Sequence, residues 1–335
     1  MTFPVSIGPC SVGIIGAGVI STSVHIPVLR AMDGVNIAWI ADSRADLAAS
    51  VARLNHTQPA PIVDGPAGLP KADVVLLAIP LPPRQTYLDY YRDGRTGLLL
   101  EKPLANSFAQ HRAIVTAFEP WQVATCYQRR YYAASQFVAE VLASGTFGPL
   151  KRIRVSEGGR VTRTDGGGDY KSVPVSAGGG IVKNLGCHSL DLILWLTAAA
   201  DFEIAQRDVA WDGETDQACH AHLVLKDSES QPICDVEWSL SWLERMLNHV
   251  DFEFAKVTLR CPNAPGPTVE LISPAGRPIG VISVEGPDRA TTSTQAFYLQ
   301  WRGMISAVQH HAEQPISARS TALCARLMDG LLESP

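Results

Sequence analysis

The feature that most constrains the fold is an apolar run that ends in glycines close to the N-terminus. Residues 11–15 are rich in β-branched side chains, and Gly16 and Gly18 follow them directly. From residue 21 to residue 32 the apolar side chains recur at helical spacing. A strand that passes through a glycine turn straight into a helix is the opening unit of a parallel α/β sheet.

The same alternation continues over the first 126 residues. Further apolar runs occur at residues 35–41, 73–79, 97–100 and 122–126, with helix candidates at 44–54, 87–92 and 108–118. The run at 73–79 is apolar almost throughout, as expected for a strand buried on both faces of a parallel sheet. We therefore predict a doubly wound Rossmann domain over residues 1–125.

After residue 126 the pattern changes to long stretches of period-2 alternation, which lie between residues 218 and 284. They predict a large, mainly antiparallel open sheet in a C-terminal α/β domain over residues 126–335. Helices are predicted at 133–143, 181–196, 296–311 and 320–332. Because few helices are available to cover so broad a sheet, we expect an apolar face that is buried in a homodimer or homotetramer.

Composition argues against several other classes of protein. The 28 basic and 33 acidic residues give a net charge of −5 without a basic stripe, so no nucleic-acid partner is expected. The longest apolar run, at 190–200, is shorter than the roughly 20 residues of a membrane span, and the N-terminus does not resemble a signal peptide. Seven scattered cysteines indicate a reducing, cytoplasmic location. No metal is expected, because no third ligand accompanies His220 and His222.

The glycine turn also predicts a dinucleotide site. Gly16 allows the tight turn, Gly18 lets the backbone approach a pyrophosphate at the helix N-terminus, and the small Ser21 takes the third position. Asp42 ends the next strand, at the distance expected for a carboxylate that accepts from ribose hydroxyls. Asp42 favours NAD, because it repels a 2′-phosphate; Arg44 could offset this repulsion, so NADP is possible.

Further motifs occur along the chain in a specific combination. They are Ala78-Ile79-Pro80, Glu101-Lys102-Pro103, the segment 127–131, and the triplet 178–180 followed by Gly186, His188 and Asp191. With the glycine turn, they make the chain resemble the glucose–fructose oxidoreductase / inositol dehydrogenase / MocA (Gfo/Idh/MocA) family. The resemblance implies a second domain for substrate binding and oligomerisation, and NAD(P)-dependent hydride transfer on a carbinol or ketone of a sugar, cyclitol or polyol.

The resemblance and the chemistry of these side chains together assign site residues. We expect Lys102, His188 and Asn184 to be catalytic, since a histidine can take a hydroxyl proton near neutral pH and a lysine can donate to the substrate oxygen. The expected cofactor-binding residues are Gly16, Gly18, Val19, Ile20, Asp42, Ser43, Arg44, Ile79, Pro80, Glu101, Lys102 and Gln128. The expected substrate-binding residues are Lys102, Tyr127, Arg129, Tyr170, Asn184, His188 and Trp242.

Two positions depart from the family's pattern. Asn184 stands where the family usually has Asp, so it can orient the ring of His188 but cannot supply a charge, which Asp191 could supply instead. Arg84 and Gln85 stand where the family often carries a histidine. Two alternatives to a dehydrogenase or reductase stay open: an NAD-dependent enzyme whose transient oxidation yields a net elimination or hydrolysis, and a non-catalytic, NAD-binding regulatory protein.

Overall fold

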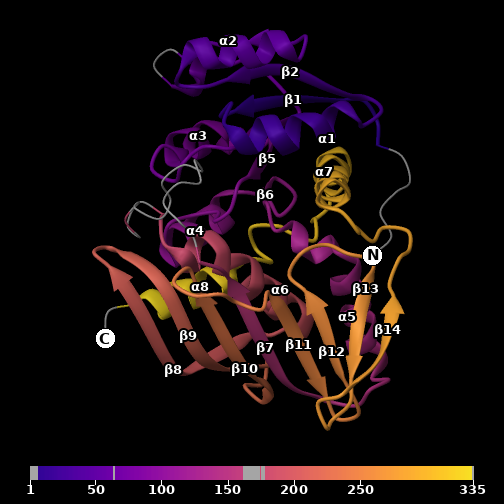
Figure 1. Cartoon of the computed structure of the whole chain (residues 1–335). Helices are drawn as coiled ribbons and strands as arrows, with labels where there is room; N and C mark the ends of the chain where they lie inside the picture. Colours follow the sequence, from indigo (N-terminus) through magenta and orange to yellow (C-terminus); the bar gives the residue numbers. More distant parts are fainter. Residues whose placement is uncertain (1–6, 63–64, 161–173, 175–177, 334–335) are drawn as a thin grey trace. The chain divides into compact units, whose positions relative to one another are not determined.

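The computed structural model describes residues 7–62, 65–160, 174 and 178–333, which form two compact units (Figure 1). The first unit comprises residues 1–126 and 297–322, and the second comprises 127–296 and 323–335. We predicted that the second domain would run from 126 to 335, so the return of 297–322 to the first unit corrects that boundary. The physical reason is apolar burial, because Phe297, Trp301 and Met304 enter the core of the first unit.

A six-stranded parallel sheet forms the centre of the first unit. Its order is β3-β2-β1-β4-β5-β6, with parallel pairing throughout. Because β4 and its neighbour β5 are buried along their whole length, both are continuously apolar. The strands are β1 (Cys10–Ile15), β2 (Val35–Ala41), β3 (Gln58–Pro59), β4 (Val74–Leu77), β5 (Gly97–Leu100) and β6 (Val123–Thr125). This topology confirms the predicted doubly wound fold.

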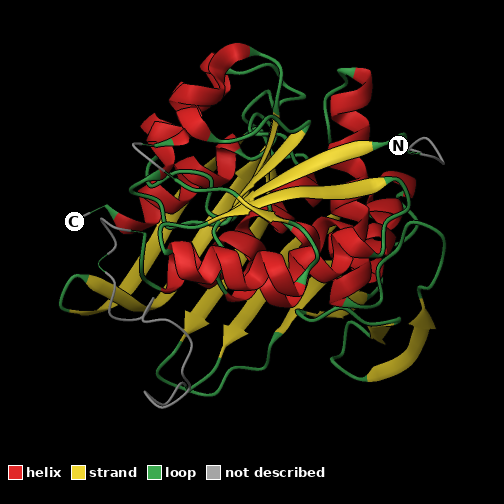
Figure 2. Cartoon of the chain, turned by 90° about the horizontal axis from the view of Figure 1, so that it is seen from above, coloured by secondary structure: helices red, strands yellow, loops and turns green. Residues whose placement is uncertain are grey.

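Helices lie on both faces of this sheet (Figure 2). Apolar side chains of α1, α2 and α7 pack in one core, and those of α3 and α4 pack in the other. A π-helical turn, η1, leads from the glycine loop into α1. These elements are η1 (Ser21–His25), α1 (Ile26–Arg30), α2 (Ala45–Leu54), η2 (Pro66–Gly68), α3 (Arg84–Tyr90), η3 (Tyr91–Asp93), α4 (Phe108–Ala117) and α7 (Ser293–His310).

The second unit contains an eight-stranded sheet in the order β14-β13-β12-β11-β7-β10-β9-β8. Strands β7 and β10 run parallel, and the other neighbours are antiparallel. This confirms the prediction of a mainly antiparallel sheet. The strands are β7 (Leu150–Gly158), β8 (Asp201–Asp212), β9 (Thr215–Lys226), β10 (Pro232–Ser241), β11 (His249–Phe254), β12 (Thr258–Pro262), β13 (Thr268–Ile272) and β14 (Pro278–Ser283).

The helix that carries His188 packs directly on this sheet. Gly186 allows the close approach, because a Cβ there would lie 2.6 Å from Leu240 and 2.8 Å from Trp238. The Trp238 indole donates a hydrogen bond of 3.0 Å to the Ser189 hydroxyl. The helical elements of the unit are η4 (Gln128–Tyr131), α5 (Ala133–Ser144), η6 (Val182–Gly186), α6 (Cys187–Thr197) and α8 (Ala322–Leu332). Over the residues described, no helix is both long and apolar enough to cross a membrane.

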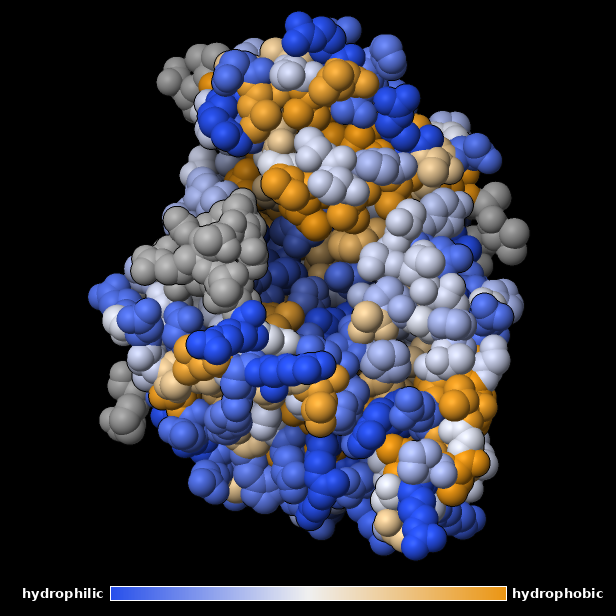
Figure 3. Space-filling model, in the orientation of Figure 1, coloured by the Kyte–Doolittle hydropathy of each residue, from blue (hydrophilic) through white to orange (hydrophobic). Residues whose placement is uncertain are grey.

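The opposite face of the sheet is polar rather than apolar, which corrects the expectation from the sequence. Arg154 forms ion pairs with Glu237 and Glu253 of the two neighbouring strands. Next to them, Arg260 donates two hydrogen bonds of 2.8 Å to Asp251. Figure 3 shows hydrophilic residues over most of this face. The expectation was wrong because the period-2 alternation places charged side chains, not apolar ones, on the uncovered side.

Candidate active site

The glycine loop has the geometry of a nucleotide-binding turn. Gly16 has a φ of +102°, and a Cβ there would lie 2.2 Å from the carbonyl oxygen of Ala78, so only glycine fits without strain. Ser21 braces the turn by donating a hydrogen bond of 2.5 Å to the Gly16 carbonyl. At Gly18 no atom lies within 4 Å of the position of a Cβ. The loop therefore leaves open space where a pyrophosphate would approach the backbone.

Asp42 links this loop to the end of β2. Its Oδ2 accepts a hydrogen bond of 2.8 Å from the Ala17 amide, and its Oδ1 accepts one of 2.9 Å from the Arg44 amide. The exposed Arg44 guanidinium also lies 3.6 Å from Oδ1. Each carboxylate oxygen can accept a second bond, so the group keeps acceptor capacity for ribose hydroxyls.

Most of the predicted cofactor residues lie at one edge of the parallel sheet. They follow the carboxyl ends of β1, β2, β4 and β5, which is the edge where open α/β sheets bind ligands. The exception is Gln128, which belongs to the second unit. The residues at this edge are Gly16, Gly18, Val19, Ile20, Asp42, Ser43, Arg44, Ile79, Pro80, Glu101 and Lys102. Together with the open space at Gly18, this grouping fits NAD.

Lys102 follows β5 and lies next to a buried hydrogen-bond network. The Trp301 indole donates a hydrogen bond of 3.0 Å to Nδ1 of His25, so the proton of the imidazole ring belongs on Nε2. Nε2 in turn lies 2.9 Å from Oε1 of Glu101, to which it donates. Oε2 of Glu101 in turn accepts from the Lys102 amide at 3.2 Å. Burial acts to raise the pKa of Glu101, but the hydrogen bond from His25 and the charges of Lys102 and Arg84 outweigh it and lower that pKa.

The spacing of His25, Glu101 and Cys126 resembles that of a metal site, because one ligand atom from each lies within 4.8 Å of the others. A metal would need the lone pair of His25 Nε2 and a thiolate. The hydrogen bond from Trp301 instead leaves the proton on Nε2, and burial raises the pKa of Cys126 well above its usual value. The cluster is therefore a hydrogen-bond network rather than a metal centre.

Arg84 supports Lys102 from the other side. It is buried at the start of α3, and its guanidinium donates to the carbonyl oxygens of Ile79 at 2.9 Å, Glu101 at 2.6 Å, and Pro103. These carbonyls follow the ends of two neighbouring strands, so one side chain ties both ends together around Lys102. The sequence showed Arg84 only as a departure from the family's pattern, and nothing local in it indicated this role.

In the second unit, Asn184 lies in η6 and His188 in the first turn of α6, so both belong to one helical segment, as predicted. Asp216 of β9 holds the start of this segment, because its Oδ2 accepts a hydrogen bond of 2.8 Å from the Val182 amide. Gly180 makes room for it, since a Cβ there would lie 1.6 Å from Asp216 Oδ1. Asp216 lies more than 30 residues away along the chain, and nothing local in the sequence indicated this role.

The neighbours of His188 differ from those expected. Asp191 binds Arg130 through two hydrogen bonds, 2.8 Å from Nε and 2.5 Å from Nη2, so its charge is paired with Arg130 rather than with His188. Tyr127, expected to bind substrate, is 2% exposed. Its ring meets the His188 ring edge-on, with 5.9 Å between centroids. Tyr127 thus packs behind His188 and restricts the orientation of its ring.

A cleft of about 340 Å³, wide open to solvent, adjoins this segment within the second unit. Trp242, predicted to bind substrate, forms part of its wall, and Leu185 connects it to the segment that carries Asn184. Tyr170, also predicted, lies outside the described residues. The remaining lining residues, which no motif in the sequence indicated, are Glu157, Gly158, Gly159, Arg160 and Asn248. The volume is in the range of small-molecule sites, about 300–1,000 Å³.

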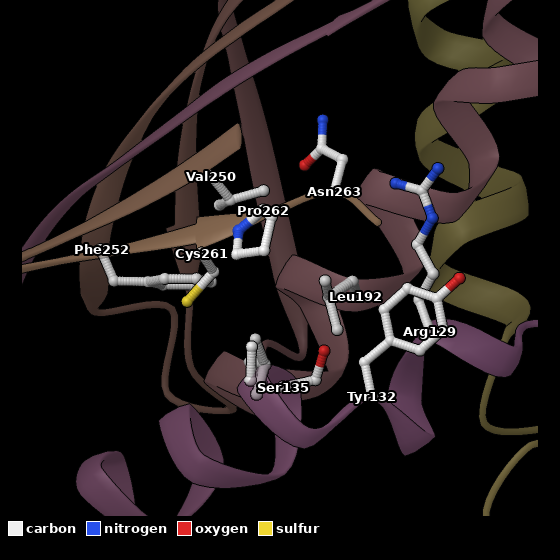
Figure 4. Close-up of a pocket in the computed structure, with 11 residues that line it drawn as sticks. Arg129, Tyr132, Ser135, Leu192, Val250, Phe252, Cys261, Pro262 and Asn263 are labelled. Atoms are coloured by element: carbon white, nitrogen blue, oxygen red, sulfur yellow. The ribbon is translucent and has the colours of Figure 1, made fainter. Parts of the chain in front are cut away.

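Arg129 does not line this cleft but forms a buried ion pair with Glu157, which does. Figure 4 shows Arg129 beside a second hollow, between Leu192 of α6 and Val250 and Phe252 of β11. This hollow has a volume of about 10 Å³, enough for roughly one water molecule. It is therefore too small for a substrate.

Two family models match the chain. One, described as an oxidoreductase family with an NAD-binding Rossmann fold, matches residues 10–127, and the other, the GFO/IDH/MocA C-terminal domain, matches residues 135–246. The chain belongs to the Gfo/Idh/MocA family. As a member of this family it is an NAD(P)-dependent oxidoreductase, and its first unit is the dinucleotide-binding domain. A comparison with curated proteins finds no match.

Solved structures share the fold of this family member at low sequence identity. A 3-ketoreductase from Actinomadura kijaniata, in complex with NADP and TDP-benzene, is 17% identical with a TM-score of 0.78 over 97% of each chain. An oxidoreductase from Agrobacterium radiobacter, in complex with NAD+, L-tartaric acid and magnesium, is 16% identical with a TM-score of 0.74, covering 96% of this chain and 94% of that one. UDP-N-acetylglucosamine 3-dehydrogenase from Acidithiobacillus ferrooxidans is 16% identical with a TM-score of 0.73, and the match covers 97% of this chain and 99% of that one.

Proposed function

We propose that this oxidoreductase acts on a carbinol or ketone of a sugar, cyclitol or related polyol, with Lys102 and His188 as its catalytic groups. The observation that carries the proposal is the arrangement around Lys102. Arg84 on one side and Glu101 with His25 on the other hold the lysine turn at the carboxyl edge of the NAD-binding sheet. A surface lysine without a catalytic role would not need so many buried contacts on its turn.

In this proposal each side chain has a separate task. Bound nicotinamide supplies the hydride acceptor for oxidation or the hydride donor for reduction. The Lys102 ammonium donates a hydrogen bond to the substrate oxygen and stabilises the negative charge that develops on it. The His188 imidazole takes the hydroxyl proton during oxidation and returns it during reduction. Asn184 orients the substrate or the ring without adding charge.

Sugar substrates are supported by relatives with the same fold, since the structures compared above include a 3-ketoreductase and a UDP-N-acetylglucosamine 3-dehydrogenase. We also propose a homodimer that forms through the polar face of the large sheet, where rows of alternating charge, such as Arg154 between Glu237 and Glu253, can pair with a second copy. All seven cysteines are buried thiols rather than disulfides, which supports the proposal of a cytoplasmic location. Sedimentation as a monomer at micromolar concentration would contradict the dimer.

The function is tested by incubating the protein with NAD and a panel of sugars, cyclitols and sugar nucleotides while the absorbance band of NADH is followed. Net oxidation of one compound, with stoichiometric NADH, supports a dehydrogenase. Consumption of a compound without NADH accumulation indicates a transient oxidation and a net non-redox reaction. Tight NAD binding without consumption of any compound supports a regulatory binding protein and rejects the proposal.

A further inference from the structure

We infer that the free edge of β14 pairs with the same edge of a second copy of this chain, antiparallel and centred on Val281. This contact goes beyond the proposed reaction and is separate from the dimer proposed through the polar face. Strand β14 comes last in the order of the large sheet, and among the described residues only β13 pairs with it. The outward N–H and C=O groups of such an edge are a template for pairing with another chain.

The β14 edge lacks the features that usually prevent pairing. Charged side chains and prolines within the strand protect most edges, but β14 has no charged residue, and its one proline is the first residue, Pro278. Ile279 and Val281 are 60% and 64% exposed. Val281 stands opposite Glu270 of β13, so the polar face of the sheet becomes apolar where it reaches this edge. Figure 3 shows hydrophobic side chains there, at the lower right.

The hydrogen bonds between β14 and β13 show which residues of the edge point outward. The Val284 amide donates a hydrogen bond of 2.7 Å to the Pro267 carbonyl, so the backbone groups of residue 284 face β13. Successive residues of an antiparallel strand alternate in direction, so Ser283 and Val281 direct their N–H and C=O groups outward. Two copies of Val281 that meet on a two-fold axis can therefore exchange both of their hydrogen bonds.

The charges at the two ends of the strand favour this register. Arg277 lies four residues before Val281, Glu285 lies four residues after it, and both are exposed. In a pairing centred on Val281, Arg277 of each copy stands opposite Glu285 of the other, so symmetry provides the ion pair twice. A shift of two residues in either direction separates these charges. Opposite charges and β-branched side chains are cross-strand pairs that stabilise antiparallel strands.

The first test is disulfide cross-linking of the full chain through Val281→Cys, with copper phenanthroline as the oxidant. The two new thiols would lie directly opposite each other, whereas the seven native cysteines are buried. Ser283→Cys is the matched control, because residue 283 is also exposed on β14 but would lie more than about 13 Å from its copy, too far for a disulfide. Since one short strand buries little area, protein on the order of 100 µM is used.

We expect Val281→Cys to form the covalent dimer at least about 10-fold faster than Ser283→Cys or wild type. Equal rates for Val281→Cys and Ser283→Cys, or a Val281→Cys rate no higher than that of wild type, would overturn the inference. Packing of two polar faces without edge pairing gives no reason for a difference between the two positions, so this comparison separates the two kinds of contact.

The second test exchanges the charges in the Val281→Cys background. Arg277→Glu places like charges opposite each other at both ends of the pairing, and Glu285→Arg does the same with the other sign. Each single change should slow cross-linking by about 10-fold. The double variant restores opposite charges and should cross-link within about threefold of the starting rate. A double variant as slow as the single ones would contradict the register centred on Val281.

Discussion

Replacing Arg84 by methionine should loosen the lysine turn of the first unit. The guanidinium donates to the carbonyl oxygens of Ile79, Glu101 and Pro103, with the first two bonds at 2.9 and 2.6 Å. Methionine fills a similar volume but donates nothing, so buried acceptors lose their donor. Each unpaired acceptor costs about 1–3 kcal/mol. Since such effects are not additive, we expect a total near 3 kcal/mol.

The suitable assay is amide hydrogen exchange read by mass spectrometry on peptides that contain β5, because it reports the local free energy of opening. A loss of about 3 kcal/mol corresponds to a roughly 100-fold fall in protection. Arg92→Met is the matched control, since Arg92 is half-exposed and pairs with Asp89, which is half-exposed as well. It should change protection by less than about threefold. If Arg84→Met left the protection of β5 at the wild-type level, the assigned role of Arg84 would be refuted.

Three further changes test the first unit and the large sheet. Gly16→Ala should reduce stability by about 1–3 kcal/mol and weaken NAD binding, because its Cβ would meet the Ala78 carbonyl at 2.2 Å; an unchanged melting temperature and NAD affinity would argue against this. The wild type should bind NAD more tightly than NADP, and Asp42→Ala should narrow that difference in titrations of both cofactors; a wild-type preference for NADP would reject the assignment of Asp42. Burial acts to raise the pKa of Asp251, but the hydrogen bonds from Arg260 and His249 outweigh it and lower that pKa from 3.8 to about 2. The folded-state pKa is depressed, so this stabilisation is present above about pH 4 and is lost as the pH falls toward 2. Asp251→Asn should therefore lower the free energy of unfolding, measured in urea, by about 1–2 kcal/mol at pH 7, a value reduced for solvent screening at the partly exposed Arg260. At pH 2 the same substitution should change it by almost nothing. An equal loss at both pH values would contradict the link between this ion pair and stability.

The parts of the fold that the sequence predicted correctly depend on local signals. The glycine turn before Ser21 and the apolar run at 73–79 identify their elements without reference to the rest of the chain. Helix α7 carries a helical pattern as well, but nothing local shows that Phe297 and Trp301 pack into the first unit. That assignment depends on contacts with residues more than 250 positions away.

The site shows the same division between local and distant information. The motif around Lys102 and the spacing of Asn184 and His188 identify candidate catalytic residues. The sequence does not show that Asp191 is already paired with Arg130, 61 residues away, or that Arg129 is paired with Glu157. The polar open face could have been predicted, because polar and charged residues stand at alternate positions of several strands in the sequence, but the expectation of an apolar face overlooked them.

In the proposed reaction, His188 moves the proton during hydride transfer. The most direct measurement is the rate of NADH formation in a single turnover with a substrate found in the panel, compared among wild type, His188→Ala and His220→Ala. His220 lies on the exposed side of β9 and serves as the control. We predict that His188→Ala lowers the rate by roughly 10²–10⁴-fold, while its NAD affinity and the rate of His220→Ala stay at wild-type levels. A near-normal rate for His188→Ala would contradict it.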